Sequence, residues 1–306
     1  MPKVFRFTDY GGPETQEFVD LDKPIAGPTE LLVRVKAAGV NPFDFKLRSG
    51  MFKDYLPREL PSEFGSELSG VVEQVGGDVE GFAVGDEVFG SPAPGHGAFS
   101  EYTVTSAAGT AHKPAQVSFT DAATLPVAAA TGYDGVEQLG LSRGQKLLIT
   151  GIGGGVGVVA AQIARDRGIA VFGTASEAKR ALVESLDATW IGYGDGVADR
   201  IRELLPDGVD AIFDLVGGDA LRAVADLVKD PSKLITAADP VTAGEFGGAL
   251  LSRERSVRVL DLIAQLVAEG RLDPHVNDVL SFDDAVQAMA AVESGHAMGK
   301  VVISFN

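Results

Sequence analysis

The segment KLLITGIGGGVGVVAAQIARDRG, residues 146–168, decides the fold of this chain. Its apolar run 147–149 predicts a buried strand, residues 151–157 contain five glycines, and an amphipathic helical pattern follows. This strand–turn–helix unit holds the pyrophosphate of a dinucleotide, because the turn directs backbone N–H groups and the positive end of the helix dipole toward the phosphates. We therefore expect a dinucleotide site formed by Gly153, Gly154, Gly155, Val156 and Gly157.

The glycines of this segment depart from the strict GxGxxG spacing. They fit Gly151-x-x-Gly154-x-x-Gly157, overlapped by Gly155-x-Gly157-x-x-Ala160. A glycine-rich turn can also serve only to join a strand to a helix, and that alternative stays open. The strand and helix that flank the turn favour the binding interpretation.

Length and composition narrow the class of protein. A chain of 306 residues predicts two domains, and the absence of cysteine excludes disulfides and thiolate metal sites. A net charge of −17 argues against nucleic acids and anionic membranes as partners. No apolar run approaches the length of a membrane span, and residues 1–12 lack the pattern of a signal peptide, so we expect a cytoplasmic protein.

The order of predicted elements divides the chain into two regions of different secondary structure. The first part is rich in short strands, at residues 4–10, 30–40, 69–90 and 98–105, and a helical stretch follows at 118–140 with Thr120 or Asp121 as its N-cap. From residue 146 to 238 strands and helices alternate, which predicts a parallel, doubly wound sheet. Helices at 256–270 and 282–293 and a strand at 299–305 complete the chain.

Several motifs resemble one superfamily, in order along the whole chain. They are KAAGVNPFDFKLRSG (36–50), FGSELSGVVEQVGGDVEGFAVGDEVFG (64–90), GAFSEYTV (97–104), GGGVGVVAAQIA (153–164) and GHAMGKVVISF (295–305). These segments are similar to those of the medium-chain dehydrogenases/reductases, and in particular to the zinc-independent quinone oxidoreductase branch. The resemblance implies an α/β protein with a Rossmann-type doubly wound sheet and a β-rich GroES-like barrel. We expect the GroES-like substrate domain at 1–121 and 272–306, and the Rossmann cofactor domain at 122–271.

The same comparison of motifs predicts that the chain holds no metal. Zinc-dependent members carry a cysteine after AGV, a histidine before the glutamate of the second motif, and a four-cysteine loop. Here the first two places read Asn41 and Ser66, and the cysteine loop is absent. Glu67 remains, but one carboxylate cannot build a tetrahedral zinc site.

The strand at 170–175 indicates which nicotinamide cofactor binds. NAD-binding proteins place an acidic residue about 20 residues past the glycines, whereas here Thr174 is followed by Ala175 and Ser176. Glu177 is the alternative ribose ligand, although Thr174-x-x-Glu177 also has the spacing of a capping box. With Ser176, Lys179 and Tyr193 nearby, the pattern favours NADPH.

Further cofactor contacts are implied by the resemblance. It places Asn41 beside the nicotinamide, Thr131 against its carboxamide and Lys300 near the pyrophosphate. Val216 and Gly217 end the strand at 210–217, so we expect them at the carboxyl edge of the sheet near the nicotinamide ribose.

Tyr55 and Asn41 are the catalytic candidates. In relatives the loop that contains Tyr55 lines the substrate mouth, and an uncharged phenol can donate a hydrogen bond to an oxygen that gains negative charge. The alternative for Tyr55 is an aromatic wedge within loop 51–60. None of the four histidines has a serine or cysteine partner that suggests nucleophilic catalysis.

The leading hypothesis is an NADPH-dependent reductase that transfers hydride to quinones or α,β-unsaturated carbonyls without zinc. A zinc-free carbonyl or alcohol oxidoreductase and a non-catalytic NADPH-binding regulatory protein remain as alternatives. Relatives imply a homodimer formed through the edge of the cofactor-domain sheet. The segment 239–255 is shorter than in relatives, which leaves dimerisation and substrate size open, and Phe246 within it can line the pocket or belong to the core.

Overall fold

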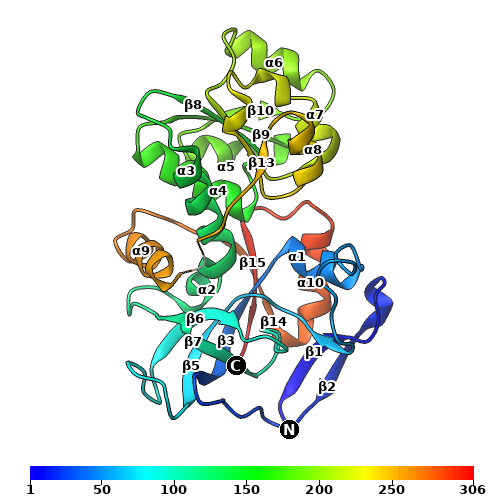
Figure 1. Cartoon of the computed structure of the whole chain (residues 1–306), viewed down its shortest axis with the longest axis vertical. Coiled ribbons are helices and arrows are strands. Elements are labelled where there is room, and N and C mark those ends of the chain that lie inside the picture. The colour runs from blue at the N-terminus through cyan, green and yellow to red at the C-terminus, as the bar shows by residue number, and fades with distance from the viewer. Residues whose placement is uncertain (255) are drawn as a thin grey trace. The chain divides into compact units, whose positions relative to one another are not determined.

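The chain, described here by a computed structural model at residues 1–254 and 256–306, divides into two compact units (Figure 1). The second unit is Ala128–Glu254, and the first comprises Met1–Val127 with the described residues after Glu254. Both boundaries differ from the expected 122–271. Helix α9 (Val257–Ala268), expected in the cofactor domain, instead contacts strand β7 of the first unit, because its apolar face with Val259 and Ile263 is buried there.

The second unit is built on a six-stranded parallel sheet with strand order β10-β9-β8-β11-β12-β13. This is the order of a dinucleotide-binding Rossmann fold. Residues Leu147–Ile149 of β8 are fully buried, as expected for a parallel strand covered on both faces. The strands are β8 (Lys146–Thr150), β9 (Ala170–Ala175), β10 (Thr189–Gly192), β11 (Ala211–Asp214), β12 (Leu234–Thr236) and β13 (Ala249–Leu250).

Helices connect these parallel strands, because a parallel pair cannot be joined by a tight hairpin. The connecting helices are α4 (Gly155–Asp166), α5 (Arg180–Ser185), α6 (Val197–Leu204), α7 (Gly218–Arg222) and α8 (Pro240–Glu245), and α3 (Ala130–Leu139) precedes the first strand, β8. Phe246 packs against the apolar core formed by β8, β11 and α6, so the core alternative holds for this residue. Of the segment 239–255, residue 255 lies outside the described residues.

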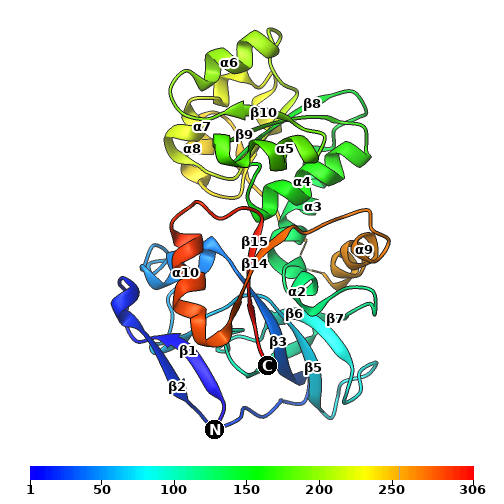
Figure 2. The same ribbon diagram turned by 180° about the vertical axis from the view of Figure 1, so that it is seen from behind.

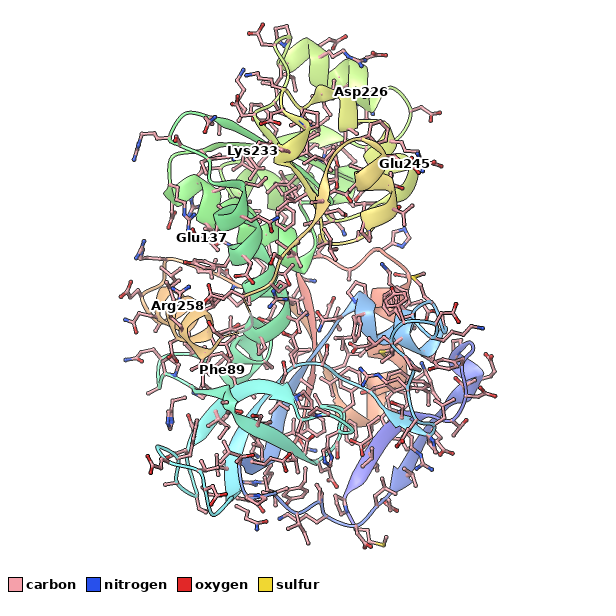
Figure 3. All side chains as sticks on the ribbon, viewed as in Figure 1. Phe89, Glu137, Asp226, Lys233, Glu245 and Arg258 are labelled. Carbon is pink, nitrogen blue, oxygen red and sulfur yellow. The ribbon has the colours of Figure 1, made fainter. Side chains whose placement is uncertain are left out.

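The first unit is a barrel with a small additional sheet. The N-terminal half of β3 (Glu30–Val40) pairs with β7 (Tyr102–His112), its C-terminal half pairs with β15 (Lys300–Ser304), and β5 (Leu68–Val75) lies along its other side. Strand β6 (Glu87–Pro92) joins β5 to β7 and closes the barrel, and Phe89 on this strand is fully buried (Figure 3). The register places Val40 opposite Val301, and Ala38 opposite Leu68, so three strand ends meet at one point.

The remaining elements surround this barrel. Strand β14 (Val276–Ser281) runs parallel to β15, and helix α10 (Ala285–Glu293) packs on both (Figure 2). The small sheet is formed by β1 (Lys3–Phe7), β2 (Gln16–Asp20) and β4 (Ser62–Glu63), and the helices are α1 (Pro42–Arg48) and α2 (Phe119–Ala122). The cap predicted at Thr120 or Asp121 is wrong. The hydroxyl of Ser118 caps α2 by accepting a hydrogen bond from the Asp121 N–H, because the helix begins at Phe119, two or three residues earlier than expected.

Candidate active site

The glycine turn between β8 and α4 has the geometry of an anion site. Gly151 adopts φ +71°, and a Cβ on Gly157 would lie 2.5 Å from the carbonyl oxygen of Ile152, so both positions require glycine. Helix α4 begins directly after Gly154. Helical geometry leaves the first N–H groups of α4 without an acceptor inside the helix, and they fit a pyrophosphate. The residues concerned are Gly155, Val156 and Gly157.

Lys179 lies on this glycine turn. Its side chain is partly buried over Gly153, where an added Cβ would come within 2.7 Å of the Lys179 Cδ. Burial lowers the pKa of the Lys179 ammonium below its ordinary value. Ser176 precedes the short 3-10 turn Glu177–Lys179 that follows β9, so Ser176 and Lys179 lie at the carboxyl end of that strand.

The capping box considered for Thr174 and Glu177 does not form. Thr174 belongs to β9 and accepts a hydrogen bond from the Gly151 N–H at 3.4 Å, while the turn begins only at Glu177. The Glu177 carboxylate is exposed and lies 3.7 Å from Arg180. Glu177 therefore projects outward from the turn and pairs with its own neighbour.

Tyr193 follows the adjacent strand β10, and its side chain is 64% exposed. Arg200 on α6 holds the loop around it, since its guanidinium donates hydrogen bonds to the carbonyl oxygens of Gly192 (2.8 Å) and Asp195 (2.8 Å). Sequence reasoning missed Arg200. The signal in the sequence for this contact was the position of Arg200 on the helix that follows the loop.

A buried carboxylate shapes the loop at the end of β11. Asp214 is fully buried and accepts hydrogen bonds from the hydroxyls of Thr150 and Thr236, each at 2.6 Å. The same carboxylate accepts from the N–H groups of Val216 (3.2 Å) and Gly217 (3.0 Å). Asp214 thereby fixes the loop expected near the nicotinamide ribose. Sequence reasoning missed it, although an acidic residue that ends an apolar strand was the available signal.

Thr131, on α3, is buried beside a second charged pair. Its hydroxyl oxygen accepts a hydrogen bond from Arg253 Nη1 at 2.6 Å, and Arg253 Nε donates to Asp134 at 2.9 Å. Burial raises the pKa of the Asp134 carboxyl. The structure therefore places Thr131 at a polar cluster of the second unit, with part of its hydrogen-bonding capacity used by Arg253.

Asn41 belongs to a buried network where the three strand ends of the first unit meet. Its Nδ2 donates to Glu67 Oε1 at 2.8 Å, and its Oδ1 accepts from Lys300 Nζ at 2.8 Å. Lys300 Nζ also donates to Glu67 Oε1 (2.8 Å) and to the Val40 carbonyl (3.0 Å). Glu67 Oε2 accepts from the Val127 N–H at 2.8 Å. Lys300 is 4% exposed and Glu67 0%, so the network is buried.

This environment differs from the one expected for Lys300. An ammonium group has three donors, and all three are directed to acceptors within the first unit. A pyrophosphate oxygen would have to displace one of these acceptors. We therefore assign Lys300 to the buried network and no longer to the pyrophosphate.

Asp44 lies next to the network, at the start of α1. Its Oδ2 accepts a hydrogen bond from the Asn41 N–H at 2.8 Å. Burial raises the pKa of the Asp44 carboxyl to about 7, a change that the hydrogen bond from Asn41 and the Lys300 charge only partly oppose. The Lys300 ammonium thus lies near two carboxyl groups, those of Asp44 and Glu67, and forms its ion pair with Glu67.

Tyr55 lies in loop 51–60 with its side chain 73% exposed. Its ring is 5.6 Å from that of Phe52, which in turn stacks on Phe43 at 5.5 Å. The aromatic contacts are compatible with the wedge role, and the exposed phenol is compatible with donation to a bound molecule. Both interpretations of Tyr55 therefore stay open.

Within residues 1–254 and 256–306, no three His, Asp or Glu side chains are grouped as a metal ion would require. Nor does any helix in this part of the chain have the length and apolar character needed to cross a membrane. The absence of zinc remains a prediction from Asn41 and Ser66.

The fold and the glycine turn define a two-unit, dinucleotide-binding protein, and comparisons with known proteins agree. Residues 27–115 match the model of the alcohol dehydrogenase GroES-like domain, and residues 189–303 match that of the zinc-binding dehydrogenases. Asn41 and Ser66, which stand where zinc-dependent members carry zinc ligands, lie outside the segment that matches the zinc-binding dehydrogenase model.

Among curated proteins, 2-methylene-furan-3-one reductase of Solanum lycopersicum is 34% identical, over 98% of this chain and 78% of the relative. The NADPH-dependent alkenal/one oxidoreductase of Arabidopsis thaliana chloroplasts is 30% identical, over 98% and 79%. The solved quinone oxidoreductase of Coxiella burnetii superposes with a TM-score of 0.88 at 31% identity, over 100% of this chain and 99% of that chain. The chain belongs to the medium-chain dehydrogenase/reductase superfamily, in its quinone oxidoreductase-like branch, and is an oxidoreductase. The predicted family and fold class are confirmed.

Proposed function

We propose that the protein is an NADPH-dependent reductase that transfers hydride to a quinone or to the β-carbon of an α,β-unsaturated carbonyl, without zinc. The observation that carries the proposal is the glycine turn of α4 beside a β9 strand that ends without an acidic residue and with Lys179 over the turn. The names of two relatives, a methylene-furanone reductase and an NADPH-dependent alkenal/one oxidoreductase, support the same cofactor and acceptor class.

Each part of the cofactor has proposed partners in this chain. The first turn of α4, with Gly153–Gly157, would hold the pyrophosphate, and the loop Val216–Gly217 the nicotinamide ribose. The 2′-phosphate would meet Ser176, Lys179 and Tyr193, which follow two adjacent strands, with Thr174 at the end of β9. We propose Asn41 and Thr131 as the residues beside the nicotinamide. When bound, NADPH supplies the hydride.

The protein must then stabilise the charge that develops on the acceptor. Hydride arrives at carbon, the conjugated π electrons move toward oxygen, and that oxygen gains negative charge. A phenol can donate a hydrogen bond to it without carrying charge itself, and we propose Tyr55 for this role. A proton from water then completes the hydroquinone or the saturated carbonyl product.

We further propose a homodimer formed through the edge strand β13. Ala249 and Leu250 are exposed, and β13 pairs with β12 alone among the described strands, so its outer edge offers backbone groups to a second copy. A cytoplasmic location also remains a proposal, from the sequence.

A matched set of acceptors tests the function. Purified protein would be mixed with NADPH or NADH and with 1,4-benzoquinone, but-3-en-2-one or its saturated counterpart butan-2-one. We expect NADPH oxidation with the quinone and the enone, and butan-2-one as the product of the enone. Reduction of butan-2-one alone would instead favour a carbonyl reductase, and tight NADPH binding without turnover would favour a regulatory protein.

A further inference from the structure

We propose that Glu67 and Lys300 are positioning residues that hold the Asn41 carboxamide in one orientation for hydride transfer. The inference rests on the proposed function, because it takes Asn41 to lie beside the nicotinamide. Its starting point is the buried network in which the two Asn41 polar atoms contact different, oppositely charged groups.

The contacts select one of the two flip states of the Asn41 amide. An ammonium group can only donate hydrogen bonds, and a carboxylate can only accept them. Lys300 therefore requires the oxygen of Asn41, and Glu67 requires its nitrogen. Turning the amide over would place Nδ2 against the ammonium and Oδ1 against the carboxylate, and both contacts would become repulsive.

The fixed orientation leaves one hydrogen of Asn41 Nδ2 weakly held. Its other acceptors are Ser66 Oγ at 3.4 Å and the Gly39 carbonyl at 3.5 Å, both at the limit of a hydrogen bond. Of these two residues Ser66 is partly exposed and Gly39 is buried, so the contact with Ser66 lies at the edge of the network. A flipped amide would present an acceptor there.

Stability alone is a poor reason for this arrangement. Removing two charges from water costs more than a typical ion pair recovers, and apolar side chains of similar size often stabilise a core as well or better. The pair of Lys300 and Glu67 is buried at a barrel end, next to the Asn41 amide and the Asp44 carboxyl. A positioning role explains why both charges contact the same amide.

The test replaces both charges at once with Lys300→Met and Glu67→Gln, so that no single buried charge is left unpaired. The carboxamide introduced by Glu67→Gln can donate or accept, and the orientation of Asn41 is no longer enforced. We expect the NADPH dissociation constant to stay within about twofold, and the single-turnover rate of hydride transfer at saturating NADPH and enone to fall by roughly 10- to 100-fold. Side-chain amide NMR signals of Asn41, identified by their loss in Asn41→Asp, should lose their protection from hydrogen exchange.

A second buried lysine of the same barrel provides the control. Lys113 donates to the carbonyl oxygens of Val117 (2.7 Å) and Pro114 (3.1 Å) and lies 2.9 Å from Glu87. The matched change Lys113→Met with Glu87→Gln should leave the hydride-transfer rate and the Asn41 signals unchanged. Glu87 is 47% exposed, so an equal loss in both double variants would show a general effect of removing a buried lysine and would overturn the positioning role.

Other outcomes also decide the question. An unchanged hydride-transfer rate in the Lys300/Glu67 double variant, with an active parent, overturns the proposal. If the parent reduces no quinone or enone, the proposed function fails, and the exchange of the Asn41 amide still shows whether Lys300 and Glu67 fix it. Should the double variant not fold, Lys300→Ala is assayed with ethylammonium, which should restore the rate whereas tetramethylammonium should not. Equal effects of the two ions would overturn the proposal.

Discussion

Replacing Lys179 by alanine should convert the cofactor preference of this protein. Lys179 is the cation that lies over the glycine turn at Gly153, at the end of a strand without an acidic residue. If its ammonium contacts the 2′-phosphate, the variant loses a charge-assisted hydrogen bond to NADPH. NADH has no 2′-phosphate, so its affinity should change little.

The expected magnitude follows from the partial burial of Lys179. A charge-assisted contact of this kind contributes about 1.5–3 kcal/mol, which corresponds to a roughly 10- to 150-fold rise in the NADPH dissociation constant. Burial lowers the pKa of Lys179, so its ammonium loses the proton at a lower pH than an ordinary lysine does. NADPH affinity of the parent should therefore fall as the pH rises through this lowered pKa, and Lys179→Ala should lack that part of the pH dependence.

Cofactor fluorescence titrations with NADPH and NADH, at low and high salt, measure these changes. Lys229→Ala is the matched control, because Lys229 belongs to the same unit but pairs with Asp210 at the amino ends of the strands. An unchanged NADPH dissociation constant in Lys179→Ala would refute the assignment. Equal weakening of NADPH and NADH would show that Lys179 acts by packing on the turn and not through the 2′-phosphate.

Four further predictions concern other parts of the chain. Tyr55→Phe should lower the catalytic constant by up to roughly 100-fold with NADPH binding intact, and an unchanged rate would leave Tyr55 as a loop wedge. Elemental analysis after dialysis should find no stoichiometric zinc, and one zinc per chain would contradict the reasoning from Asn41 and Ser66. Light scattering should give about twice the 31.8 kDa chain mass, with Leu250→Asp on β13 shifting the protein toward monomer; a monomeric parent would exclude the dimer. Because the Asp44 pKa is raised from 3.8 to about 7, the parent should lose up to about 4 kcal/mol of unfolding free energy as the pH rises through this interval. Denaturant titrations of Asp44→Asn should lack this loss, and parallel curves for the two proteins would contradict the raised pKa.

The sequence predicts the buried strands well because burial leaves a strong pattern. The strand at 30–40 and the strand at 146–150 are confirmed with the expected bounds, since both are apolar runs bounded by turn residues. The strands that were missed are exposed or very short, namely β2 (Gln16–Asp20), β4 (Ser62–Glu63), β13 (Ala249–Leu250) and β14 (Val276–Ser281). Their pairing depends on neighbours far along the chain, which no local pattern reports.

The contacts of the candidate site also fall into those that the sequence could predict and those that it could not. Contacts that follow from one strand–turn–helix unit, such as those of Gly155 and Lys179, could be proposed from spacing alone. The network around Asn41 could not, because Glu67 is 26 and Lys300 259 residues away along the chain. Only the register of β15 and β5 on β3 brings these three side chains together.

Lys179 and Lys300 show why residue type alone does not assign a phosphate ligand. Both were expected to contact the cofactor through its phosphates. Lys179 lies in the turn after β9, and Lys300 is the first residue of β15. The Lys300 ammonium is buried with three oxygen acceptors within 3.0 Å, so binding a phosphate would break a paired, buried contact. Lys179 lies over the glycine turn beside N–H groups that favour an anion, so a phosphate bound there leaves the buried pair of Lys300 and Glu67 intact. The buried acceptors around Lys300, which only tertiary structure brings together, are therefore the reason that we expect Lys179 and not Lys300 to respond to the cofactor phosphates.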